Sequence, residues 1–352
     1  MKLLILYTEI ARYTLACLSE FIAQHPEVEV HLVRWPVNDE APFDFSFDKK
    51  IKVYERNKFN SKQLIELADE IQPSAILCSG WIDKEYLNVC KKWKAKIPVI
   101  LVMDNKWLGT FKQQIARLVS SFSILRRFNF AWVPGEAQKK YALRLGFPEK
   151  NIRTGFYSAD VSFFHKNYLA IADSKMKKMP HRFIFAGRYY DFKGVNELWK
   201  AFAQWKSQKE NDWELWCVGT GDITPFEHPS IKHFGFVQPE KMTEIMNETG
   251  VFILPSRVEP WGVAVHEFAA AGFPLLLSEQ VGASSQFLKD GQNGFSFQGG
   301  DVDGIITAMK SIAALSDDKI FRMGKISSEQ AQTITPQTWS ATLFDLIQSK
   351  VS

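Results

Sequence analysis

Short apolar segments of strand length alternate with longer segments of helical periodicity along the chain. Segments of the first kind are typical of buried β-strands, and they cover residues 2–7, 28–34, 75–79, 99–103, 182–187, 214–219, 251–255 and 274–278. Helical periodicity covers residues 15–24, 62–71, 195–206, 262–271, 302–314 and 319–333. This alternation predicts parallel sheets with helices on both faces. The predicted fold is therefore α/β, built from doubly wound, Rossmann-like domains.

The length of 352 residues predicts two such domains. A polar, lysine-containing stretch over residues 167–180 is interpreted as the linker between them. We therefore expect a first domain over residues 1–165 and a second over residues 166–335. Apolar side chains at helical spacing predict a last helix within residues 336–352.

The composition excludes several classes of protein. Hydrophobic residues make up 46% of the chain, which is enough for two cores and excludes a disordered protein. The first apolar segment is too short for a secretory signal, and no apolar run approaches the length of a membrane span. The cysteines are scattered and the histidines lack ligand spacing, so we expect no disulfide and no metal. These features predict a cytoplasmic protein without a cofactor.

Glycine is distributed unevenly between the two predicted domains. Five glycines fall in residues 1–160 and fifteen follow them. Because glycine permits close approach of the backbone to a ligand, the second domain is the better candidate for binding a nucleotide.

The glycine motifs of two common nucleotide-binding classes are absent. No Gly-x-Gly-x-x-Gly follows the first strand, which disfavours a nicotinamide-dependent dehydrogenase, and no Gly-Lys-Ser/Thr motif indicates a P-loop NTPase. The best Gly-x-Gly is Gly219-Thr220-Gly221, after a predicted strand. It is interpreted either as a plain turn or as a phosphate contact.

Two basic residues follow the predicted strand at 182–187. Gly187-Arg188 ends this strand, and Lys193-Gly194 precedes the next helix. Arg188 and Lys193 can converge on one point above the sheet edge, where two cations suit a diphosphate. The alternative is a surface arginine and a solvated lysine.

The most specific feature is the segment from Glu259 to Glu267. Glu259 is expected in the loop and Glu267 inside the following helix, so that both carboxylates can face one side of the helix start, with Pro260 at an early helical position. The N–H groups of Gly262 and Val263 would then form an anion-binding helix N-terminus. Alternatively, Glu259 caps the helix and Glu267 pairs with a buried arginine.

These motifs occur in one fixed order with several others. The series comprises Gly187-Arg188, Lys193-Gly194, Val218-Gly219-Thr220-Gly221, Phe234-Gly235-Phe236-Val237, Leu254-Pro255-Ser256, the two glutamates, and Glu279 through Gly282 to Asp290-Gly291-Gln292-Asn293-Gly294. It resembles the retaining glycosyltransferases of family 4, which have the GT-B fold. The match is specific over about residues 182–297. The resemblance implies two Rossmann-like domains that face each other across a cleft, with the last helix crossing back to the first domain.

The resemblance also implies roles for individual residues. The nucleotide-sugar would bind the second domain and the acceptor the first, without a metal. Arg188 and Lys193 match the cations that neutralise the donor diphosphate, and Glu259 matches the glutamate that contacts the donor sugar. The remaining matches in the nucleotide-sugar site are Glu267 at the ribose, Phe236 and Val237 at the base, Gly262 and Val263 at the sugar and phosphate, and Gly187 and Gly221 in its glycine turns.

The first half departs from the family pattern. Tyr7-Thr8-Glu9 replaces the usual glycine-rich loop after the first strand. Where the family often has a histidine near the donor sugar, this chain has Asp104. Asp104 is a candidate for that catalytic role, or it is a loop or cap carboxylate beside Lys106.

The segment from residue 105 to residue 135 contains no acidic residue but five basic ones. Within it, apolar residues follow helical spacing. A basic amphipathic helix suits contact with an anionic membrane at its inner face, and an ordinary packed helix with a solvated basic face is the alternative. The moderate pI of 8.7 and the absence of a recognised motif argue against nucleic-acid binding.

The sequence therefore predicts a retaining, metal-independent glycosyltransferase. It would transfer a hexose from a UDP- or GDP-sugar to a glycan or lipid-linked acceptor, in bacterial surface polysaccharide synthesis. The alternatives are a nucleotide-sugar epimerase or phosphorylase on the same fold, or a non-catalytic nucleotide-sugar-binding protein.

Overall fold

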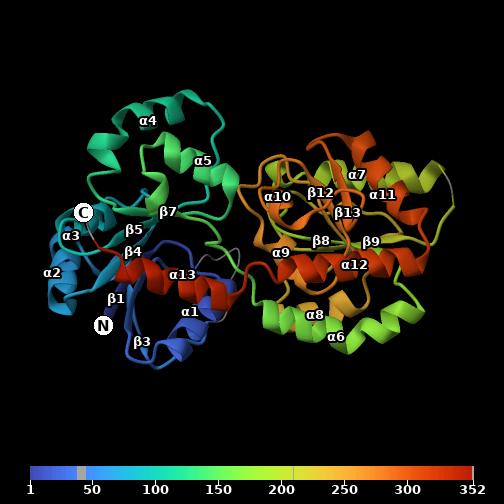
Figure 1. Ribbon diagram of the computed structural model, residues 1–352. Coiled ribbons are helices and arrows are strands. Elements are labelled where there is room, and N and C mark those ends of the chain that lie inside the picture. The colour runs from blue at the N-terminus through green and yellow to red at the C-terminus, as the bar shows by residue number, and fades with distance from the viewer. Residues whose placement is uncertain (38–44, 209, 351–352) are drawn as a thin grey trace. The chain divides into compact units, whose positions relative to one another are not determined.

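A computed structural model describes residues 1–37, 45–208 and 210–350 of the chain. The chain divides into two compact units, each with its own parallel sheet (Figure 1). Unit 1 comprises Met1–Ser158 together with Pro336–Ser352, and unit 2 comprises Ala159–Thr335.

Unit 1 is built on a seven-stranded parallel sheet in the order β3-β2-β1-β4-β5-β6-β7. The strands are β1 (Lys2–Tyr7), β2 (Glu29–Arg34), β3 (Ile51–Glu55), β4 (Ala75–Ser79), β5 (Val99–Val102), β6 (Phe130–Trp132) and β7 (Ile152–Arg153). In register, Leu4 lies between His31 of β2 and Ile76 of β4. The strand order reverses between β1 and β4, which is the point where doubly wound sheets place ligands.

Helices cover both faces of this sheet. They are α1 (Arg12–Gln24), α2 (Ser61–Ile71), α3 (Lys84–Trp93), α4 (Phe111–Ser123), α5 (Glu136–Arg144) and α13 (Pro336–Gln348), with short 3-10 turns η1 (Arg56–Lys58) and η2 (Glu149–Asn151). One core contains α2, α3 and α5, and the other contains α1 and α13. The last helix therefore belongs to unit 1, where Trp339 packs 4.9 Å from the ring of Trp132.

Unit 2 has a six-stranded parallel sheet in the order β10-β9-β8-β11-β12-β13. The strands are β8 (Arg182–Ala186), β9 (Glu214–Val218), β10 (Ile231–His233), β11 (Val251–Leu254), β12 (Leu275–Ser278) and β13 (Gly294–Phe297). The helices are α6 (Val161–Lys177), α7 (Val195–Gln208), α8 (Pro239–Asn247), α9 (Val263–Ala270), α10 (Ser284–Phe287), α11 (Val302–Ala313) and α12 (Asp317–Ala331), with the turn η3 (Asp191–Lys193). Here the order reverses between β8 and β11.

The interpretation of residues 167–180 as a linker is wrong. Most of this stretch belongs to α6, which Asp160 caps by accepting a hydrogen bond from the N–H of Phe163 at 3.1 Å. Buried side chains along one face, including Phe164 and Tyr168, hold the helix on unit 2. The division between the units accordingly falls before α6, between Ser158 and Ala159.

One lysine of α6 is buried in unit 2. Lys175 is 3% exposed, its Nζ donates a hydrogen bond to the carbonyl of Met246 at 3.0 Å, and it lies 3.9 Å from the ring centroid of Phe273. Burial lowers the pKa of this ammonium group to about 7.

We expect Lys175 to make stability depend on pH. Between pH 7 and the ordinary lysine pKa of 10.5, the unfolded chain holds a proton that the folded chain has lost, so the free energy of unfolding rises with pH. The free energy of unfolding of the wild-type protein, taken relative to that of Lys175→Met, should rise by about 2–3 kcal/mol between pH 6 and pH 9. Denaturant titrations of both proteins at the two pH values measure this rise. A wild-type-to-variant difference that does not change with pH would contradict it.

Candidate functional site

The two sequence motifs that carry Lys193 and Glu259 meet at the carboxyl edge of the unit 2 sheet. The N–H groups of Arg257 and Val258, after β11, donate to the carbonyl of Phe192 in η3 at 2.8 and 3.1 Å. At Gly194 the chain passes so close to β11 that a Cβ atom would lie 2.3 Å from the carbonyl oxygen of Pro255. Glycine at this position therefore allows η3 to dock on the loop after β11.

This docking places Lys193 against Glu259. The Lys193 ammonium donates to Oε2 of Glu259, and the two side chains are only 20% and 11% exposed. The sequence interpretation gave the two residues separate contacts with a ligand. The structure shows that, in the protein alone, they form an ion pair with each other.

Glu259 also lies beside the start of α9. A Cβ atom added to Gly262, the N-cap residue of this helix, would lie 3.1 Å from Cγ of Glu259. Its backbone is held by a bridge to Val281 and by the N–H of Gly282, which donates to the Glu259 carbonyl at 3.0 Å. The first N–H groups of α9, at Val263 and Ala264, have no acceptor within the helix. A cation, a carboxylate and a positive helix end thus lie together.

One detail of the predicted helix start is wrong. Helix α9 begins at Val263, so Pro260 lies ahead of the helix and not in its first turn, while Glu259 lies in the preceding loop as expected. The segment from Glu259 to Trp261 is instead held against the chain after β12, where the N–H of Ala283 donates to the Trp261 carbonyl at 2.9 Å. Glu267 lies within α9 and is half-buried.

The glycines after β8 and β9 let two loops pack backbone to backbone. The N–H of Gly187 donates to the Val218 carbonyl at 3.0 Å, and the N–H of Tyr189 donates to the Thr220 carbonyl at 2.8 Å. A Cβ atom at Gly219 would lie 1.9 Å from the Gly187 carbonyl oxygen, and one at Gly221 would lie 2.5 Å from that of Tyr189. These contacts give Gly219 and Gly221 a packing role. Arg188 lies half-buried in the first of the two loops.

The residues predicted to bracket a base lie on the next loop along this edge. Phe236 and Val237 follow β10 and are half-buried. The loop joins the others through the N–H of Gly219, which donates to the Gly235 carbonyl at 2.8 Å. The loops after β8, β9, β10 and β11 therefore follow one edge of the sheet, where doubly wound domains bind ligands.

Two buried polar atoms close to Glu259 in the chain lack hydrogen bonds within the described residues. They are Oγ of Ser256 and the indole nitrogen of Trp261. Such atoms are rare in folded interiors, and they are expected where a ligand supplies the partner. Sequence reasoning assigned neither a site role, because a buried serine or tryptophan carries no pattern of its own.

His266, next to Glu267, fixes α9 on its buried side. Its Nδ1 accepts from the N–H of Ala159 at 3.0 Å, and its Nε2 donates to the carbonyl of Ala331 at 2.9 Å. Burial lowers the pKa of His266 to about 4, so the neutral ring that makes these two contacts persists at neutral pH. The histidine thus ties the site helix to both ends of the unit 2 chain.

Asp104 belongs to unit 1 and lies after β5. It accepts a hydrogen bond from the hydroxyl of Tyr157 at 3.3 Å. Burial, together with the nearby carboxylate of Asp104, raises the pKa of Tyr157 well above its ordinary value, so the tyrosine is a hydroxyl donor at neutral pH. At the end of β1, where the family has a glycine loop, the N–H of Thr8 donates to Oγ of Ser79 at 2.9 Å. The hydroxyl groups of the same two residues share a second hydrogen bond, also at 2.9 Å.

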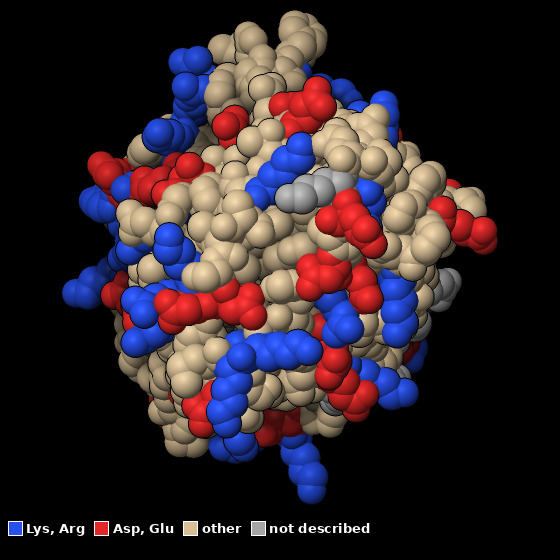
Figure 2. Space-filling view, turned by 90° about the vertical axis from the view of Figure 1, so that its right-hand side faces the viewer, with Lys and Arg blue, Asp and Glu red and all other residues tan. Residues whose placement is uncertain are grey.

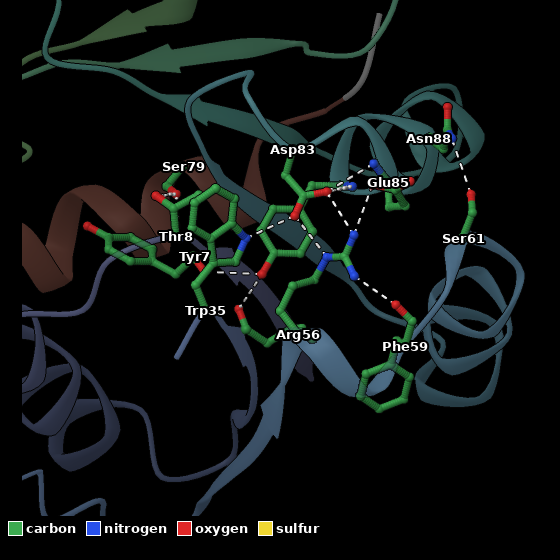
Figure 3. Close-up of polar contacts among 12 residues, drawn as sticks. Tyr7, Thr8, Trp35, Arg56, Phe59, Ser61, Ser79, Asp83, Glu85 and Asn88 are labelled. Atoms are coloured by element: carbon green, nitrogen blue, oxygen red, sulfur yellow. Dashed lines mark hydrogen bonds and ion pairs between the residues drawn. The ribbon is translucent and has the colours of Figure 1, made fainter. Parts of the chain in front are cut away.

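A partly buried ion network organises the rest of this edge in unit 1 (Figure 3). The guanidinium of Arg56 contacts both carboxylate oxygens of Asp83, at 2.8 and 3.1 Å, and Glu85 at 2.9 Å. The indole of Trp35, which is partly exposed after β2, donates to Asp83 at 2.9 Å. Burial alone would raise the pKa of Asp83, but these hydrogen bonds outweigh it and the pKa is lowered. The network fixes the ends of β2, β3 and β4 relative to one another.

Among the described residues, no group of three or more histidine, cysteine or acidic side chains is arranged to hold a metal ion. No helix in the described part of the chain combines the length and apolar character needed to cross a bilayer. The face turned to the viewer in Figure 2 carries interspersed acidic and basic side chains, without a continuous basic surface.

Residues 180–314, most of unit 2, match the family model described as glycosyl transferases group 1. An uncharacterized glycosyltransferase of Methanocaldococcus jannaschii is 28% identical over 120 residues, which cover 32% of this chain and 30% of that relative. The matched segment therefore spans under a third of that protein's length.

Two solved structures resemble nearly the whole chain. Anabaena HepE in complex with UDP and glucose aligns over 99% of this chain and 100% of its own, with a TM-score of 0.72 and 14% identity. An E. coli trehalose-6-phosphate protein bound with UDP-2-fluoro glucose gives the same TM-score and coverage at 10% identity. At such identities the likeness shows the fold, and the predicted GT-B fold with two Rossmann-like units is confirmed.

Proposed function

We propose that this chain is a glycosyltransferase that transfers a hexose from a nucleotide diphosphate sugar with retention of configuration. The observation that carries the proposal is the contact between Lys193 and Glu259 beside the N-terminus of α9. The match of the surrounding segment to the group 1 family model supports the same activity.

In this proposal the diphosphate of the donor replaces Glu259 as the main partner of Lys193. Arg188, from the loop after β8, and the first N–H groups of α9 supply the other contacts to phosphate. Negative charge grows on the diphosphate as the sugar leaves it. Cations and amides fixed in a water-poor site stabilise that charge in the transition state, so the chain needs no metal for this step.

Once Lys193 contacts the diphosphate, the Glu259 carboxylate is available to accept hydrogen bonds from sugar hydroxyls. Glu267 is assigned to the ribose, and Phe236 and Val237 to the base. We would test UDP-glucose first among the donors. The support comes from HepE, solved with UDP and glucose, and from the E. coli protein, solved with UDP-2-fluoro glucose. GDP-sugars are the second choice.

We assign the acceptor, a glycan or a lipid-linked sugar, to unit 1. There Asp104, after β5, supplies a carboxylate, and Tyr157, after β7, supplies a neutral hydroxyl. Asp104 takes the polar role that a histidine often has in the family. We place the reaction in bacterial surface polysaccharide synthesis at the cytoplasmic side of the membrane.

The experiment is a nucleotide-release assay with UDP- and GDP-hexoses, with and without a panel of glycan and lipid-linked acceptors. The proposal predicts release of UDP or GDP that depends on an acceptor, and a product whose anomeric configuration, read by NMR, matches that of the donor. Conversion of donor to its epimer without acceptor would identify an epimerase. A requirement for inorganic phosphate would identify a phosphorylase. Donor binding without release for any acceptor would identify a non-catalytic binding protein.

A further inference from the structure

Helix α4 in unit 1 has the reverse of the usual orientation of an amphipathic helix. Phe111, Ile115, Leu118, Val119 and Phe122 recur at the spacing of a single helical face, and we call them the α4 stripe. A helix of a globular protein normally turns such a face to the core. In α4 these five side chains are 45% to 78% exposed.

The opposite face of α4 is small and polar. Ser120 is the one described residue of the helix that is buried, and Gln113 and Ala116 are half-buried beside it. Gln113 also ties the helix to the preceding loop, since its Nε2 donates to the Lys106 carbonyl at 2.8 Å and its Oε1 accepts from the N–H of Leu108 at 2.7 Å. The helix is thus fixed by its polar face, which leaves the apolar face outward.

The charged residues of the segment that carries the α4 stripe all have one sign. Lys112 and Arg117 lie on the helix, Arg126 lies with its guanidinium 5.8 Å from the ring of Phe122, and no acidic residue occurs from residue 105 to residue 135. An apolar face with a basic border is the pattern of a helix that lies in the surface of an anionic membrane.

We propose that α4 docks this protein on an anionic lipid surface, with the α4 stripe inserted among the acyl chains and the basic residues at the headgroups. The helix has 13 residues, or roughly 20 Å at 1.5 Å per residue, so it lies in the interface and does not span the bilayer. A second copy of the chain fits the surface poorly, because a symmetric contact would bring two basic borders together. This inference goes beyond the proposed transferase function and does not depend on it.

The test is co-sedimentation of the full chain with phosphatidylcholine vesicles, with and without phosphatidylglycerol. We expect binding to the anionic vesicles and much weaker binding to the neutral ones or at high salt. In the triple variant Phe111→Ser/Leu118→Ser/Phe122→Ser, the fraction of protein bound to anionic vesicles should fall about 10-fold or more. Lys112→Gln/Arg117→Gln/Arg126→Gln should lose the preference for anionic vesicles.

The matched control removes three exposed apolar side chains outside α4. Ile82→Ser/Leu169→Ser/Met176→Ser should bind vesicles as the wild-type protein does. Circular dichroism and nucleotide-release activity on a soluble acceptor should be unchanged in all variants, which separates membrane docking from folding and from the transferase. Equal sedimentation of wild type and the α4 variant would overturn the proposal. So would a dimer of the wild-type protein in size-exclusion chromatography that the α4 variant abolishes.

Discussion

Glu259→Ala should lower kcat/KM for sugar transfer by about 10²-fold or more while the fold is retained. The substitution removes the carboxylate that contacts Lys193 beside the start of α9, and with it the proposed contact with the donor sugar. Its backbone contacts with Val281 and Gly282 do not involve the side chain, so the loop should keep its course. Initial rates over a range of donor concentrations measure the effect.

The matched control is Asp318→Ala, which removes a carboxylate paired with Arg322 on the surface of the same unit. This variant should transfer sugar at the wild-type rate. If Glu259→Ala retained full activity, the assignment of the site to the Lys193–Glu259 pair would be wrong.

Asp83→Ala should destabilise unit 1 by about 3–5 kcal/mol. Asp83 is almost completely buried, and its removal leaves the guanidinium of Arg56 and the indole of Trp35 without their shared acceptor. It also removes the cap of α3, where Asp83 accepts from the N–H groups of Glu85 and Tyr86. The loss should lower the thermal midpoint of this unit by roughly 6–20 °C.

The comparison is with Asp69→Ala, which breaks the exposed ion pair between α2 and Lys92. Exposed pairs contribute at most about 1 kcal/mol, so the midpoint should change little. Similar midpoints for the two variants in scanning calorimetry would show that the network around Asp83 does not hold the strand ends together.

Much of the fold was predictable because it rests on short-range patterns. The strand at 251–255 is uniformly apolar, as expected for a strand buried on both faces, and β11 occupies it. The region of the candidate site followed from residue types at strand ends, since parallel strands place their carboxyl ends on one edge. The ion pair of Lys193 with Glu259 could not be predicted from the sequence. It depends on the close approach of Gly194 to Pro255, and these two residues lie far apart in the chain.

The errors arose where tertiary packing overrides local composition. The lysines of residues 167–180 indicated a solvated linker, yet Lys175 is buried and the segment forms α6. Pro260 fitted a helical first turn, but contacts with the chain after β12 hold it ahead of α9. For α4 the pattern alone left open which face is outward. The exposure of the α4 stripe shows that the apolar face is the outward one.

Binding of a nucleoside diphosphate at Lys193 of unit 2 can be measured by calorimetric titration of the full chain with UDP and with GDP. We predict that one of the two nucleotides binds with a single site per chain. Lys193→Ala should weaken this binding by about 10-fold or more, because it removes a charge-assisted contact with phosphate. Lys310→Ala, which alters an exposed lysine of the same unit, should bind as the wild type does. Binding of neither nucleotide, or equal affinity in Lys193→Ala and the wild-type protein, would show that Lys193 does not hold a nucleoside diphosphate.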